Sequence, residues 1–223
     1  MLLRLSGVLS ADDLATVQSL LSNAEFIDGK LSAGKVAREH KFNEELPKDA
    51  PIQDKLNQIV MSRLVTHPLY NAAALPHRVA APFYVRYRQG MCYGQHIDDP
   101  IMGDGPRYRS DIAITVFLND PADYQGGALS IQTQSDEKNV KYDAGDAVLY
   151  PASTLHSVDQ ITSGERLVAV TWVQSLVRDA ARRELLFELY LAREKLIADS
   201  PNAEETAQVD HVYTNLVRMW SEL

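Results

Sequence analysis

The sequence predicts an α+β fold in which a mainly β core, of the sandwich or jelly-roll type, lies between helical segments. Hydrophobic residues recur with a helical period before about residue 77 and after about residue 175, and they alternate with a period of two in between. Short turn-forming stretches divide the alternating region into many segments, which is typical of sandwiches and barrels. We therefore expect an N-terminal helical region (1–77), a β core (78–174) and C-terminal helices (175–223).

Two helices are expected in the N-terminal region. Ser10 is a suitable N-cap, because acidic residues fill the first turn after it and an apolar stripe follows. The second helix is expected from about Ile52 to Thr66. The polar connector between them, residues 28–43, carries two glycines and several cations, and it is either a surface loop or a flap over a site.

The core contains five segments with the composition of strands, each rich in β-branched and aromatic residues. They are FYVRYR from Phe83, DIAITVFL from Asp111, ALSIQT from Ala128, DAVLY from Asp146 and RLVAVTWV from Arg166. Beyond the core, an amphipathic helix is expected from Arg178 and another from Ala203 to Trp220. These helices either cover the outside of the sheet or form a contact between subunits.

The composition excludes several classes of protein. A chain of 223 residues with 45% hydrophobic and 23% charged residues is long enough to bury a core and lacks the character of disordered or membrane-spanning chains. The net charge of −8 disfavours a nucleic-acid backbone as a partner. Cys92 is the one cysteine, which excludes an internal disulfide and favours a reducing compartment. Because the first residues do not resemble a secretory signal, we expect a cytoplasmic protein.

The stretch HIDD from His96 points to a metal site. In an extended segment His96 and Asp98 lie on one face and Asp99 on the other, so the first two approach the same ion. His156 follows 58 residues after Asp98, far enough for intervening strands to bring the chain back beside them. Two histidines and one carboxylate form the facial triad of non-haem Fe(II) oxygenases, which leaves open positions for a chelating cosubstrate and O₂.

Three other interpretations use the same side chains. A zinc hydrolase also takes two histidines and an aspartate. A cupin-like binding or sensor module shares the barrel and the metal without turnover. In a purely structural β-domain, the three residues form a hydrogen-bonded polar cluster. The H-x-D spacing alone does not separate these alternatives.

Arg166 makes the oxygenase interpretation more specific. It begins a predicted strand ten residues after His156, and by alternation it shares a face with Val168, Val170 and Trp172. A buried arginine on an apolar face is unfavourable unless an anion pairs with it. The planar guanidinium has the geometry to form two hydrogen bonds with a carboxylate. If that anion is 2-oxoglutarate, the dianion, Arg166, a ferrous ion and one aspartate together carry no net charge. The alternative is a rim residue in the turn SGER.

These residues resemble the iron(II)- and 2-oxoglutarate-dependent dioxygenases, and the similarity to bacterial PKHD-type hydroxylases runs nearly end to end. The similar segments are YRQGMCYGQHIDD from Tyr87, RSDIAITVFLNDP from Arg109, YQGGAL from Tyr124, AGDAVLYPASTLHSV from Ala144, TSGER from Thr162, WVQSLVRDAARRELLFEL from Trp172 and YTNLVRMW from Tyr213. The resemblance implies a double-stranded β-helix (jelly roll) with the N- and C-terminal helices packed outside.

The resemblance also implies roles for individual residues. His96, Asp98 and His156 are expected to bind iron, with no catalytic side chain beyond this centre. Arg166 is expected to hold the C5 carboxylate of 2-oxoglutarate, and Tyr87 to donate a hydrogen bond to this cosubstrate. Tyr93 and Arg109 are expected at the substrate mouth. Two positions depart from the family: Ala128 replaces a usual glutamate, and Phe117 stands where animal prolyl hydroxylases have a tyrosine.

The implied activity is the hydroxylation of a substrate that the sequence does not identify, either a prolyl or lysyl side chain or a small molecule. Fe(II), 2-oxoglutarate and O₂ are the expected cofactors, with ascorbate as reductant and with release of succinate and CO₂. The family that the chain resembles includes proteins linked with iron uptake, so a link to iron uptake is also expected. No nucleic acid or membrane is expected as partner, and the C-terminal helices are a candidate surface for a homo-oligomer.

Overall fold

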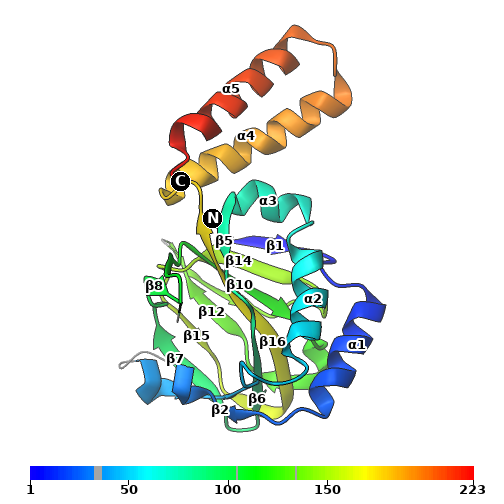
Figure 1. Cartoon of the computed structure of the whole chain (residues 1–223), viewed down its shortest axis with the longest axis vertical. Helices are drawn as coiled ribbons and strands as arrows, with labels where there is room; N and C mark the ends of the chain where they lie inside the picture. Colours follow the sequence, from blue (N-terminus) through cyan, green and yellow to red (C-terminus); the bar gives the residue numbers. More distant parts are fainter. Residues whose placement is uncertain (33–36, 104, 134) are drawn as a thin grey trace.

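The computed structural model of the chain describes residues 1–32, 37–103, 105–133 and 135–223, and it contains two antiparallel sheets with helices outside them (Figure 1). The larger sheet has the order β1-β14-β10-β16-β6-β4-β2, and β5 and β11 also pair with β16. The smaller sheet has the order β13-β12-β15-β7-β3, and β8 and β9 form a separate ribbon. This is the jelly-roll architecture that the sequence predicted.

The five predicted strands are all present, and shorter strands that the sequence did not predict complete the sheets. The strands of the larger sheet are β1 (Leu3–Leu5), β2 (Ile27–Asp28), β4 (Glu44–Glu45), β5 (Pro76–Val79), β6 (Phe83–Arg88), β10 (Ile112–Phe117), β11 (Tyr124–Gly126), β14 (Ala147–Pro151) and β16 (Ile161–Ser175). The others are β3 (Lys41–Phe42), β7 (Cys92–His96), β8 (Ile101–Met102), β9 (Tyr108–Arg109), β12 (Leu129–Gln132), β13 (Glu137–Val140) and β15 (His156–Val158).

Strand β10 shows how the core is divided. All six of its residues are buried. Ile112, Ile114 and Val116 pack into the layer between the larger sheet and the helices, whereas Ala113 and Phe117 pack between the two sheets. A strand covered on both faces has no solvent-exposed side, which explains why Thr115 is the one polar residue in the run IAITVF.

The N-terminal region packs against the outside of the larger sheet through α1 (Ala11–Ser22), α2 (Gln53–Leu64) and α3 (Pro68–Ala74). The predicted start of α1 is confirmed, because Ser10 and Asp13 form a reciprocal capping box. Helices do not account for the whole region, however. Strand β1 pairs with β14, and β3 pairs with β7, so this part of the chain also belongs to the core sheets.

The connector expected to be a loop or a flap is only partly described, because residues 33–36 lie outside the described residues. Its described ends form short 3₁₀ turns, Gly29–Ser32 and Ala37–His40, and continue into β3. The flap interpretation therefore stays a prediction.

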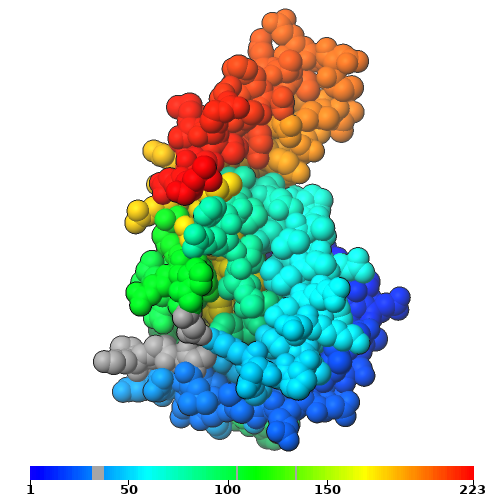
Figure 2. All heavy atoms as spheres, in the orientation of Figure 1, coloured from blue at the N-terminus to red at the C-terminus, as the bar shows by residue number. Residues whose placement is uncertain are grey.

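The C-terminal helices α4 (Ala180–Asp199) and α5 (Glu204–Trp220) form an antiparallel hairpin that stands clear of the barrel (Figures 1 and 2). At its base, Leu186 and Phe187 are buried and α4 contacts α3. Leu185, the residue before Leu186, is nevertheless 57% exposed, and Met219, near the end of α5, is 72% exposed. The hairpin therefore does not cover the sheet, which was one of the two expectations for it. In the described part of the chain, no helix combines the length and apolar character that a bilayer crossing requires.

Candidate functional site

Three side chains from two separate segments of the chain converge between the sheets. His96 is the last residue of β7 and pairs directly with His156, the first residue of β15. Asp98 lies two residues beyond the end of β7. One ligand atom from each residue lies within 4.8 Å of the other two, and His156 Nε2 is 3.9 Å from Asp98 Oδ1. The structure therefore brings the three predicted metal ligands together.

The backbone fixes the orientation of both imidazoles. His96 Nδ1 is 2.8 Å from the Gly94 carbonyl oxygen, and His156 Nδ1 is 2.8 Å from the Thr154 carbonyl oxygen. A carbonyl only accepts hydrogen bonds, so each Nδ1 carries the proton and donates it. Each Nε2 is then left with a free lone pair, which is the usual arrangement of histidines that bind metals.

Aromatic rings hold the imidazoles from the side. Tyr93 stacks on His96 with ring centroids 3.7 Å apart, and Tyr150 meets His156 edge-on at 5.2 Å. Burial, together with the neighbouring His156, lowers the pKa of His96 to about 4. His96 is therefore neutral near pH 7, as a metal ligand must be.

Asp98 lies in an environment that is unfavourable for a carboxylate without a cation. Burial raises the pKa of Asp98, and His156 and the nearby indole N–H of Trp172 only partly oppose this shift. Among the described residues, Asp98 Oδ2 has no hydrogen-bond partner. A divalent cation would supply the missing positive charge and a partner for this oxygen. The donor set of two imidazoles and one carboxylate fits Fe(II) and leaves coordination positions open.

Arg166 lies on β16 with its side chain between the sheets, directly opposite Tyr87 of β6. It is 1% exposed, and no carboxylate forms an ion pair with it within the described ranges. The guanidinium carbon is 5.2 Å from the centroid of the Tyr87 ring. Burial raises the pKa of Tyr87 to about 12, although the charge of Arg166 acts the other way. Tyr87 therefore keeps its proton and is available as a hydrogen-bond donor.

One cavity of about 940 Å³ joins the candidate metal site to Arg166. The predicted face of β16 is confirmed, because Arg166, Val168, Val170 and Trp172 all line it. The other predicted site residues that line it are Tyr87, Tyr93, His96, Asp98 and His156. Tyr93 is half-buried and stacks on a metal ligand, His96, and its place at the substrate mouth stays a prediction.

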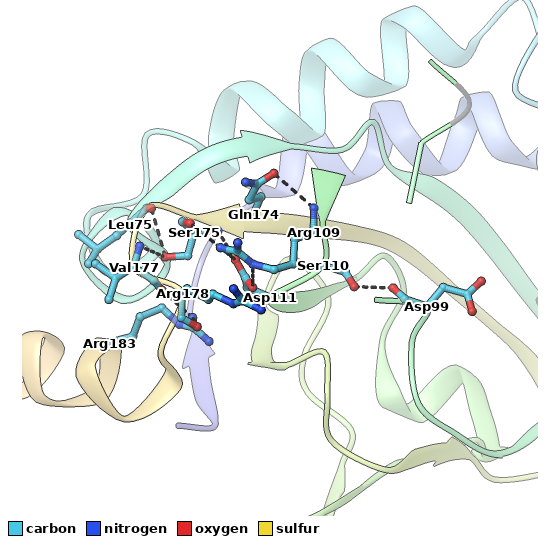
Figure 3. A network of polar contacts seen from close by, with 10 residues as sticks. All are labelled: Leu75, Asp99, Arg109, Ser110, Asp111, Gln174, Ser175, Val177, Arg178 and Arg183. Carbon is cyan, nitrogen blue, oxygen red and sulfur yellow. Dashed lines mark hydrogen bonds and ion pairs between the residues drawn. The ribbon is translucent and has the colours of Figure 1, made fainter. Parts of the chain in front are cut away.

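Arg109 does not line this cavity. Its Nε and Nη2 atoms donate to Asp111 at 2.6 and 3.0 Å, and Asp111 also accepts from the backbone N–H of Ser175 at 2.8 Å (Figure 3). The structure thus places Arg109 in a polar network at the base of the C-terminal hairpin rather than at the substrate mouth. The same network reaches the loop that carries Asp98, because the Ser110 hydroxyl donates to the carbonyl oxygen of Asp99 (Figure 3).

Some cavity residues were not anticipated from the sequence. Lys41 and Glu45 form a buried ion pair in the cavity wall, and the positive charge of Lys41 acts on the pKa of Asp98. They come from β3 and β4, strands too short to show a hydrophobic period. The place of Trp172 in the cavity could be predicted, because the alternation of β16 puts Trp172 on the same face as Arg166.

Comparison with known proteins identifies the family. The model of the 2OG-Fe(II) oxygenase superfamily matches residues 82–174, and that of the PKHD-type hydroxylase C-terminal domain matches residues 179–222. A PKHD-type hydroxylase of Thioalkalivibrio sulfidiphilus is 48% identical over 225 residues, and one of Acaryochloris marina is 42% identical over 222 residues. Both alignments cover 100% of this chain and 100% of the relative.

Solved structures with low sequence identity share the fold. A Pseudomonas putida prolyl-4-hydroxylase has a TM-score of 0.54 at 18% identity, covering 78% of this chain and 92% of that one. HygX from Streptomyces hygroscopicus, solved with nickel, 2-oxoglutarate and hygromycin B, has a TM-score of 0.54 at 15% identity, covering 79% and 84%. With the full-length relatives and the converging His-Asp-His site, the chain belongs to the PKHD-type hydroxylases of the 2OG-Fe(II) oxygenase superfamily.

Proposed function

We propose that this hydroxylase binds Fe(II) through His96, Asp98 and His156, binds 2-oxoglutarate through Arg166, and hydroxylates a substrate in the same cavity with release of succinate and CO₂. Membership of the family supports an oxygenase over a zinc hydrolase, a sensor without turnover or a structural domain. The residue roles are supported by the geometry of this chain.

One observation carries the proposal. A cluster of three metal-binding side chains and a buried guanidinium without an ion-pair partner in the described residues line the same cavity. The cluster lacks a cation and the guanidinium lacks an anion, and a divalent metal ion chelated by a dianion would meet both needs. A buried cation without an anionic partner destabilises the folded state by several kcal/mol, so Arg166 would lower the stability of a protein in which it binds no anion.

The protein's own contribution is binding, orientation and exclusion of water. The Gly94 and Thr154 carbonyls hold the two imidazoles, and Tyr87 offers a protonated hydroxyl beside Arg166. When bound, ferrous iron and 2-oxoglutarate would supply the electrons that activate O₂, and O₂ would be the oxidant. The side chains of the cavity fix where these groups and the substrate lie.

The cavity leaves room for a substrate beside the cosubstrate. Its volume of about 940 Å³ is at the upper end of the usual range of about 300–1,000 Å³ for sites that take drug-sized ligands, whereas 2-oxoglutarate has only ten non-hydrogen atoms. Phe83 and Trp172 meet edge to face at 5.5 Å in its wall, and Asp54 and Arg107 also line it. We infer a substrate with both apolar and polar groups, either a small molecule or a peptidyl side chain.

The test is an anaerobic titration of the metal-free protein, first with Fe(II) and then with 2-oxoglutarate. We expect one equivalent of each to bind and a visible charge-transfer band to appear only when both are present. His156→Ala is expected to lose the band because two ligands hold the metal poorly. A wild-type protein that binds Fe(II) but develops no band with 2-oxoglutarate would refute the proposed function. Succinate formation in the presence of O₂ and ascorbate is then measured with candidate substrates.

A further inference from the structure

The segment that carries Asp98 has no regular structure of its own. β7 ends at His96, β8 begins at Ile101, and residues 97–100 between them, all of which the structure describes, belong to neither a strand nor a helix. Asp98 is therefore not part of a strand ladder, whereas His96 and His156 pair directly with one another. Other contacts must hold the Asp98 carboxylate near the two imidazoles.

The surroundings of Asp98 favour its movement away from this position when no cation is bound. The side chain of Asp98 is 8% exposed, and its Oδ2 has no hydrogen-bond partner among the described residues. The residues on either side, Ile97 and Asp99, are exposed, so water lies close to the segment. A buried carboxylate without partners loses solvation free energy and regains it by turning towards water. Keeping Asp98 in place for a metal ion thus requires a restraint on its backbone.

Ser110 supplies such a restraint. Its hydroxyl donates to the Asp99 carbonyl oxygen (Figure 3), and its backbone N–H donates to the Pro100 carbonyl oxygen at 3.1 Å. The two bonds hold the carbonyl groups of the two residues directly after Asp98. Ser110 is itself buried, so water competes little for either bond.

Ser110 is fixed in turn by its neighbours in the chain. Arg109 and Asp111 pair with one another, and Asp111 accepts from the backbone N–H of Ser175 at 2.8 Å (Figure 3). The backbone N–H of Asp111 donates to the Val173 carbonyl oxygen at 3.0 Å, which joins this segment to β16. The strand that follows, β10, is buried along its whole length. The hydroxyl of Ser110 is therefore held in position by the core of the barrel.

We propose that Ser110 is a positioning residue for the metal ligand Asp98. Its hydroxyl holds the loop so that the carboxylate stays beside His96 and His156 before a metal ion binds. The inference rests on the proposed function, because it concerns the metal site of that function. It adds a residue that touches neither the metal nor the cosubstrate and that acts through the backbone of Asp99.

The experiment is a double-mutant cycle on the metal-free, full-length protein, with the Ni(II) affinity measured by calorimetry. Ni(II) is the probe because two imidazoles bind it more tightly than Mn(II) or Fe(II), so the affinity stays measurable when Asp98 is removed. Ser110→Ala is expected to weaken Ni(II) binding by about 10-fold, the lower end of the range for outer-shell partners of metal ligands. In the Asp98→Ala background, the same change is expected to alter the Ni(II) affinity by less than about 2-fold, because Ser110 acts on the metal only through Asp98.

Thr206→Val is the matched control. The Thr206 side chain is also buried, and its hydroxyl also donates to a backbone carbonyl oxygen, that of Ser200, at 2.7 Å. This bond lies in the C-terminal hairpin, away from the metal site (Figure 1). The variant is expected to bind Ni(II) with the affinity of the wild type even if its melting temperature falls, which separates a positioning effect from a general loss of stability.

Equal Ni(II) affinities of Ser110→Ala and the wild type would overturn the inference. Equal losses in the wild-type and Asp98→Ala backgrounds would overturn it as well, because Ser110 would then not act through the carboxylate. A wild type that binds Ni(II) no more tightly than Asp98→Ala would instead refute the metal site of the proposed function.

Discussion

Arg166→Met should change stability and cosubstrate binding in opposite directions. Methionine approximates the aliphatic part of arginine and has no charge. In the ligand-free protein, Arg166 is 1% exposed and has no ion-pair partner in the described residues, so its burial is unfavourable. Replacement of buried ionic groups by apolar residues of similar volume often stabilises by about 1–4 kcal/mol. The rings of Tyr87 and Phe117, 5.2 and 5.7 Å away, return about 0.5–2 kcal/mol through cation–π attraction.

The difference predicts that metal-free Arg166→Met is about 1–2 kcal/mol more stable than the wild type. For a chain of this size, such a gain raises the melting temperature by about 2–8 °C. Loss of a two-pronged, charge-assisted contact should weaken 2-oxoglutarate binding by at least about 100-fold. Metal binding should not change, because Arg166 is not a ligand.

Urea denaturation in EDTA and anaerobic calorimetry measure the two effects separately. Arg86→Met is the control, because the Arg86 side chain is largely buried too, at 12% exposure, but its Nε donates to Glu44 at 2.7 Å. That variant should be less stable, since it leaves Glu44 with only the longer ion pair to Arg88 at 3.9 Å. Loss of stability in ligand-free Arg166→Met, or unchanged 2-oxoglutarate affinity, would refute the reasoning.

Three further predictions follow from the same structure. Asp98→Asn should weaken Mn(II) binding by at least about 100-fold, because it removes the only charged ligand. The control Asp99→Asn should bind Mn(II) normally, and equal Mn(II) affinities of the two variants in calorimetry would contradict this prediction. Asp111→Ala should lower the free energy of unfolding by about 2–4 kcal/mol, because it strands Arg109 and a backbone N–H; a loss under about 0.5 kcal/mol in urea denaturation would count against the network. If the C-terminal hairpin joins subunits, light scattering should show an oligomer for the wild type and a monomer for Leu185→Glu. The control Ile27→Glu should have the same mass as the wild type, and a monomeric wild type would contradict the prediction.

The long, periodic elements were predictable because their burial imposes a clear pattern. β10 is covered on both faces and β16 alternates over much of its length, so both appear as hydrophobic segments in the sequence. The strands of two or three residues, such as β3 and β15, leave too few side chains for a period to be recognised. They were found only in the structure, although β15 carries a metal ligand.

The site could be predicted from the sequence where only a few residue types can do the chemistry. It could not be predicted where the place of a side chain depends on contacts between segments that are distant in the sequence. Asp98 was chosen on the assumption of an extended strand, yet it lies beyond the end of β7, so its place depends on the loop that follows. Arg109 was assigned to the substrate mouth by resemblance, although Asp111, two residues away on the same face, was available as its partner. The expected link to iron uptake and the cytoplasmic location stay predictions.

A crystal structure of the protein grown anaerobically with Mn(II) and 2-oxoglutarate tests the central claim most directly. We expect one metal ion bonded to His96 Nε2, His156 Nε2 and a carboxylate oxygen of Asp98. The 2-oxo acid end should chelate it, and the distal carboxylate should lie against the Arg166 guanidinium. A metal bound elsewhere, or a cosubstrate that leaves Arg166 without an anion, would contradict the account.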